Sequence, residues 1–173
     1  MRFQLTIRAF ILLLVSAISA GSGSVPRPQD ADALIRIQDR QLITKADRER
    51  VLNEVLTAAQ EARDASDWSR AAGFLNRAGR LQFWLHEPET ALETFKEVRE
   101  ILKNSPESPA YVDSLNGSAT VHNNIKCDEA RALTTQARIL SEHSNYVPGK
   151  AEALLLLSDC QNKDNPPQAI STA

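Results

Sequence analysis

The sequence predicts an all-helical fold in which antiparallel helical hairpins stack on one another. Apolar residues recur at steps of three and four, as in Val51, Val55, Ala58 and Ala59. Turn-forming residues interrupt this pattern at regular intervals, and no segment alternates apolar and polar residues as a strand does. Because the connections between helices of similar length are short, each helix must run antiparallel to its predecessor.

The N-terminus has the order of features that is typical of a secretory signal peptide. Arg2 and Arg8 precede an apolar run from Ala9 to Val15, which is followed by small residues. That run is much shorter than the roughly 20 residues that cross a bilayer, so no retained membrane anchor is expected. We expect cleavage near residue 20 and a periplasmic or secreted protein.

A flexible leader is expected at residues 21–29, which are rich in Gly, Ser and Pro, and a helical repeat domain at residues 30–173. Breaks in the helical pattern fall at good turn residues, such as Ser66 with Asp67 and His86 to Pro88. The helices are expected at about 30–42, 45–64, 67–85, 88–103, 109–123, 127–142, 148–162 and 166 to the end.

The charge balance and the two cysteines narrow the possible functions. Without residues 1–20 the chain has 18 Lys+Arg and 22 Asp+Glu, a formal charge of 18 − 22 = −4, which disfavours nucleic acid as a partner. Cys127 opens one predicted helix and Cys160 lies near the end of the next. Antiparallel neighbours bring these two positions together, so we predict a disulfide between them, with two buried thiols as the alternative.

Catalytic and metal-binding patterns are not found in the sequence. The three histidines stand far apart, and none is spaced from another His or Cys as metal ligands are. Known nucleophile, phosphate-loop and metalloprotease motifs are missing. We therefore expect no enzyme activity, no metal and no cofactor. The sequon Asn116-Gly117-Ser118 lies inside a predicted helix, and we interpret it as accidental.

A repeat of 39 residues places alanines at the same point of three helix starts: Ala91, Ala130 and Ala169. Small residues are needed where helix backbones approach closely. With Gly79 twelve residues before the first alanine and Phe95 four after it, the chain resembles the tetratricopeptide repeat family in a longer-period form. The second unit gives Ser118, Ala130, Thr134 and Ala137, whereas Val98 stands where the family usually has a small residue. The family's usual tryptophan and tyrosine of the first helix are absent.

Two hairpin frames fit this resemblance. In one, the helix at 67–85 is the first member of a hairpin with 88–103. In the other, it is the second member of a hairpin with 45–64, because Trp68, Ala71 and Ala78 also match the second-helix pattern. Both frames give the same stack and differ in which helix faces a partner.

The resemblance implies a short right-handed solenoid that binds a protein or peptide on its concave face. Carried onto this chain, it implies the following partner-binding residues: Asn76, Arg80, Phe83, His122, Asn123, Gln161 and Asn162. The run from Lys150 to Gln161 also resembles repeat segments that precede the catalytic domain of bacterial CHAT-type peptidases. The alternative function is therefore the N-terminal helical segment of such a peptidase, with the catalytic domain outside this chain.

Overall fold

A computed structural model describes residues 44–123 and 125–164, and within these ranges the chain forms helices and no strand. The helices are α2 (Lys45–Asp64), α3 (Trp68–Trp84), α4 (Pro88–Ile101), α5 (Pro109–Asn123), α6 (Cys127–His143) and α7 (Val147–Asp164). The all-helical class is thus confirmed, and each predicted helix in these ranges is found with its ends within two residues. The signal peptide at 1–20, the leader at 21–29 and the predicted helices at 30–42 and 166–173 lie outside the described residues.

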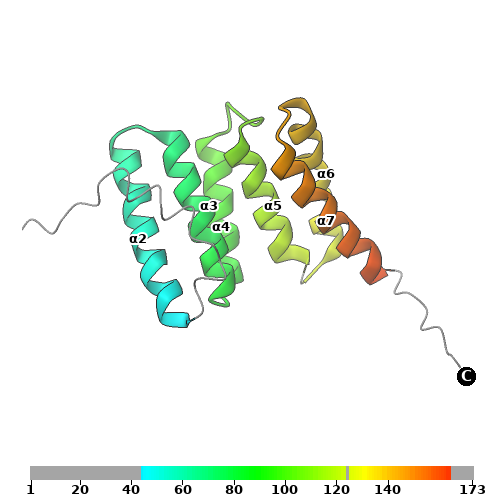
Figure 1. The fold of residues 1–173 in the computed structure, drawn as a ribbon, viewed down its shortest axis with the longest axis horizontal. Helices are drawn as coiled ribbons and strands as arrows, with labels where there is room; N and C mark the ends of the chain where they lie inside the picture. Colours follow the sequence, from blue (N-terminus) through cyan, green and yellow to red (C-terminus); the bar gives the residue numbers. More distant parts are fainter. Residues whose placement is uncertain (1–43, 124, 165–173) are drawn as a thin grey trace, which may run out of the picture.

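The helices form two layers (Figure 1). Each helix packs against the next one along the chain, and α5 also contacts both α3 and α7. Among the described helices, the backbones of α2, α4 and α6 do not approach one another, although the side chain of Arg63 of α2 reaches Glu97 of α4 in an ion pair. We call α3, α5 and α7 the continuous layer, and α2, α4 and α6 the spaced layer.

Capping residues explain where the helices begin. The Thr44 hydroxyl accepts a hydrogen bond from the Asp47 backbone N–H at 3.1 Å, and the Asp67 carboxylate accepts one from the Arg70 N–H at 3.1 Å. Helices α4 and α5 each begin with a proline, whose missing N–H has no intrahelical partner at that position. These local signals set the hairpin boundaries.

Three of the connections use the same turn. Ser66, His86 and Asn145 have φ values of 58°, 65° and 54°, which is the left-handed region. In each turn the next backbone N–H bonds to a carbonyl five residues earlier: Asp67 to Ala62, Glu87 to Gln82 and Tyr146 to Ser141. This closes each helix end in the same way and turns the chain back by a short connection.

The 39-residue repeat has a packing cause in the spaced layer. Ala91 and Ala130 are both fully buried at the starts of α4 and α6. The Phe95 ring lies against α3 and α5 at two glycines, since a Cβ atom on Gly79 would be 2.7 Å from Phe95 Cε1 and one on Gly117 would be closer still. Small residues are therefore required there. Ala169, the third alanine, lies outside the described residues.

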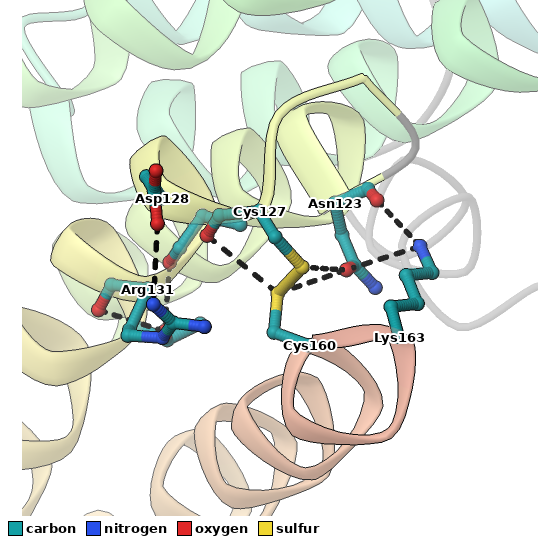
Figure 2. Close-up of a disulfide and its surroundings, with 8 residues drawn as sticks. Asn123, Cys127, Asp128, Arg131, Cys160 and Lys163 are labelled. Carbon is teal, nitrogen blue, oxygen red and sulfur yellow. Dashed lines mark hydrogen bonds and ion pairs between the residues drawn. A yellow bond between two sulfur atoms is a disulfide. The ribbon is translucent and has the colours of Figure 1, made fainter. Parts of the chain in front are cut away.

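The predicted disulfide between Cys127 and Cys160 is present in the structure (Figure 2). It joins the start of α6 to the end of α7, with the two Cα atoms 5.6 Å apart. This distance is in the ordinary range for a bridged pair. The bridge requires the two helices to run antiparallel, as the sequence predicted.

Candidate functional site

A groove lies between α3 and the start of α5, on the continuous layer. Its volume is about 350 Å³. It is lined by Ser69, Gly73, Asn76, Arg77, Arg80, Ser108, Pro109, Ala110 and Asp113. Most of these residues are polar or charged, and the charges are of both signs.

Two buried polar atoms of this groove have no hydrogen-bond partner in the protein. Asn76 is only 6% exposed, and its Nδ2 donates to the Ala110 carbonyl at 2.7 Å, while its Oδ1 accepts nothing. Ser108 Oγ is likewise without a partner. Because a buried polar group without a hydrogen bond costs about 1–3 kcal/mol, these two atoms favour a bound polar group or water.

Beside the groove, charged residues link all three helices of the continuous layer. Arg80 of α3 bonds both carboxylate oxygens of Glu152 of α7, at 2.8 and 3.0 Å. The Tyr146 hydroxyl donates to the Asp113 carboxylate, which lies 3.0 Å away at Oδ1 and 3.2 Å away at Oδ2. Burial raises the pKa of Asp113 to about 6, against the lowering effects of the Tyr146 hydrogen bond and the Arg80 charge.

A second, smaller hollow lies further along α3 and shares Arg80 with the groove. It has a volume of about 30 Å³ and is lined by Arg80, Phe83, Trp84, Phe95, Gly117 and Thr120. A cavity of about 150 Å³ holds one benzene molecule, which corresponds to about 25 Å³ for each of its carbon atoms. The hollow therefore has room for a single methyl group.

Three of the residues that the resemblance implied, Asn76, Arg80 and Phe83, thus lie together along the α3–α5 seam. His122 and Asn123 lie at the other end of α5. His122 Nδ1 is 2.8 Å from Glu129 Oε2 at the start of α6.

Asn123 lies beside the disulfide, with its Oδ1 3.0 Å from Cys160 Sγ, and its backbone carbonyl accepts a hydrogen bond from Lys163 Nζ at 2.5 Å (Figure 2). Both His122 and Asn123 therefore have contacts that hold the end of the α5–α6–α7 unit together.

The two remaining residues, Gln161 and Asn162, are exposed on α7. The flank of α7 that faces the groove carries Glu152, and the flank beside α6 carries Lys150, which contacts Glu142 at 3.1 Å. At 100° per residue, Gln161 lies within about 20° of Lys150, and Asn162 points away from the core. The helix geometry thus places neither residue beside the groove.

Sequence reasoning missed Asn116, a second buried asparagine that, like Asn76, donates to a backbone carbonyl in the first turn of a neighbouring helix. Asn116 of α5 is fully buried, and its Nδ2 donates to the Gly149 carbonyl in the first turn of α7 at 2.9 Å. Asn76 makes the equivalent bond from α3 to Ala110 in the first turn of α5. The 40-residue spacing of the two asparagines was a usable signal. A fully buried Asn116 side chain is also inaccessible to glycosylation.

Comparison with known proteins found no family model, no curated protein and no solved structure that matches this chain. In residues 44–123 and 125–164, every helix is too short or too polar to cross a membrane. The contacts along the α3–α5 seam are thus the observations from which a function can be argued.

Proposed function

We propose that this chain is an exported protein-interaction module of the tetratricopeptide-like kind, which holds an extended segment of a partner protein along the α3–α5 seam. Export is supported by the signal-like N-terminus and by the disulfide, which persists in oxidising compartments. The partner is a protein or peptide, and the site serves binding without catalysis.

The observation that carries this proposal is the groove with its two unpartnered atoms. An extended peptide offers a backbone N–H and a backbone carbonyl at every residue. In the complex, Asn76 Oδ1 accepts from such an N–H and Ser108 Oγ donates to such a carbonyl, after the neighbouring groups that bury both atoms in the free chain have moved aside. The intrachain bond from Asn76 Nδ2 to Ala110 fixes the amide, so its oxygen is oriented before a partner arrives.

The small hollow adds a preference for one side chain. Asn76 and Phe83 are seven residues apart on α3, or about 10 Å along the helix, which an extended chain covers in about three residues. A segment whose backbone bonds at Asn76 therefore reaches the hollow about three residues later. There the limited volume beside Phe83, Trp84 and Phe95 favours alanine over larger residues.

The layer arrangement supports the family resemblance and one of its two frames. In tetratricopeptide-like stacks the first helices of the hairpins form the continuous, partner-facing layer. Here α3 packs against α5 and α5 packs against α7, whereas the backbones of the described helices of the other layer do not pack against one another. The frame in which the helix at 68–84 begins a hairpin agrees with these contacts.

The test is selection of binders from a random-peptide display library with the oxidised protein as bait, followed by affinity measurement on the selected peptides. Ser69 is exposed at the mouth of the groove, and Ser69→Trp fills that mouth without disturbing the core. We expect this variant to weaken binding at least tenfold and to leave the melting temperature unchanged.

The matched control is Thr135→Trp, at a position that is also exposed, on α6 in the spaced layer. It should bind the same peptides as the unaltered protein does. A library that yields no binder, or binders that ignore Ser69→Trp, would overturn the proposed function. A selected consensus with large residues at every position would overturn the role given to the hollow.

A further inference from the structure

Helix α7 presents an uncharged, partly apolar stripe on the face opposite its buried side. Its buried side consists of Gly149, Ala153, Leu156 and Cys160. On the opposite face, Val147 is 73% exposed, Leu154 48% and Leu155 68%. The small or polar residues Ala151, Ser158 and Asn162 complete the stripe, and all three are exposed. We call these six residues the α7 stripe.

The α7 stripe breaks the packing rule of the rest of the stack. Helix α3 is packed between α2 and α4, and α5 is packed between α4 and α6. In the described part of the chain, α7 contacts α6 and α5 and has no helix beyond it. It lies at the end of the stack opposite α2 (Figure 1). Its outward face therefore exposes apolar area that inner helices of this stack bury.

The other end of the stack is built differently. The outward face of α2 carries exposed polar residues, among them Glu49, Asn53, Gln60 and Asp64, and Leu56 is its one exposed large apolar side chain, at 37%. Such a polar face is what terminal repeats need for contact with water. The α2 end of the described stack thus has a polar outward face, whereas the outward face at the α7 end is partly apolar.

We propose that the α7 stripe is the interface of a homodimer, in which α7 of one copy packs antiparallel against α7 of a second copy. The stripe is complementary to itself when read in reverse. With the two-fold axis between residues 154 and 155, each of these two leucines meets its own counterpart in the second copy. On either side of them, Ala151 faces Ser158 of the second copy, and small residues at these positions let the backbones approach closely.

Charge placement agrees with this pairing. The charged residues nearest the stripe are Lys150, which already contacts Glu142, and Asp159. In the antiparallel pair, each of them lies about 13 Å along the helix axis from the same residue of the second protein. This distance exceeds the Debye length of about 8 Å at physiological salt, so the repulsion between the like charges is largely screened. A head-to-tail contact of α7 with α2 would instead take Glu49, which pairs with Lys45, or Asp64, which accepts from Gln60, out of water, and burying such a charge is costly.

The size of the contact sets the strength of the dimer. An 18-residue helix is about 27 Å long, and one helix pair of this length buries on the order of 1,000 Å² in total, at the low end of specific interfaces. The dimer is consequently in equilibrium with monomer over the micromolar range.

The experiment is sedimentation velocity on the oxidised, exported protein from about 1 to 300 µM. The average mass should rise towards twice the monomer mass with concentration. Leu155→Glu places a charge at the centre of the stripe and should hold the protein monomeric. Ile139→Glu is the matched control, because Ile139 is 41% exposed on α6, and this variant should dimerise as the unaltered protein does.

Cross-linking tests the register. Leu154→Cys places two thiols close to the two-fold axis and should give a covalent dimer on mild oxidation. Val147→Cys places them about 22 Å apart along the axis and should not. A monomer at every concentration would overturn the proposal and assign the stripe to a different occupant, such as residues beyond α7 or another protein. A dimer that ignores Leu155→Glu, or equal cross-linking at both positions, would also overturn it.

Discussion

Opening the bridge between Cys127 and Cys160 should lower the stability of the folded chain by an amount that follows from its loop. The two residues are 33 apart in sequence. For a loop of that length the chain-entropy relation gives about 12.5 cal/mol/K, or about 3.7 kcal/mol at 25 °C. For a domain of this size that corresponds to a drop in melting temperature of about 10 °C. The helices themselves should persist, because the bridge restricts the unfolded chain more than it shapes the folded one.

The assay compares circular dichroism melts at 222 nm of the oxidised protein and of protein unfolded, reduced and refolded with reductant present. Unfolding first is needed because Cys160 is only 1% exposed. Reduction leaves both sulfur atoms in place, so no cavity is added to the effect of the lost bond. The double variant Cys127→Ser with Cys160→Ser, melted with and without reductant, controls for the reagent. Melting temperatures of the dithiol and disulfide forms that agree within about 2 °C would refute the reasoning.

Three further perturbations test the continuous layer. Because the pKa of Asp113 is raised to about 6 in the folded chain from an ordinary 3.8, its proton is held more tightly when folded, and the unfolding free energy should fall as pH rises from about 4 to 6. The full pKa shift corresponds to about 3 kcal/mol of unfolding free energy, which we reduce to about 2 kcal/mol because the carboxyl is partly exposed. Asp113→Asn should remove this pH dependence of stability, as measured by urea titrations at pH 4 and 7. Asn116→Ala removes a fully buried side chain and its hydrogen bond to the Gly149 carbonyl of α7, and it should cost about 1–3 kcal/mol by the same titration, whereas the exposed Asn53→Ala should change little. Gly79→Ala should destabilise by about 1–2 kcal/mol in spite of its better helix propensity, and a Phe95→Leu background should reduce that loss.

Local signals in the sequence were sufficient for the helices and their turns. Apolar spacing and turn residues placed all six described helices, because helix periodicity and capping act over a few residues. The pairing of Cys127 with Cys160 followed from helix direction alone and is confirmed. The same spacing could not decide between the two hairpin frames, because both give the same buried stripes.

The candidate site depends on contacts between distant residues, and these were less accessible. Nothing near Arg80 in the sequence indicates its ion pair with Glu152, 72 residues away. Asn116 was interpreted from its neighbours as an accidental sequon, although its role is set by a carbonyl that approaches from α7. Likewise, the ring of Phe95 meets two glycines from different helices, so no single helix pattern reveals that contact.

The disulfide also decides what happens when the chain is cut. Between Cys127 and Cys160 the backbone and the bridge together form a covalent ring that holds α6, the turn around Asn145 and most of α7. A protease that nicks this exposed turn leaves the two pieces tied together and packed. A nick in the connection between α4 and α5 has no such tie, so the pieces on either side are free to separate once they unfold. A single cut between Cys127 and Cys160 therefore releases no fragment while the bridge is intact.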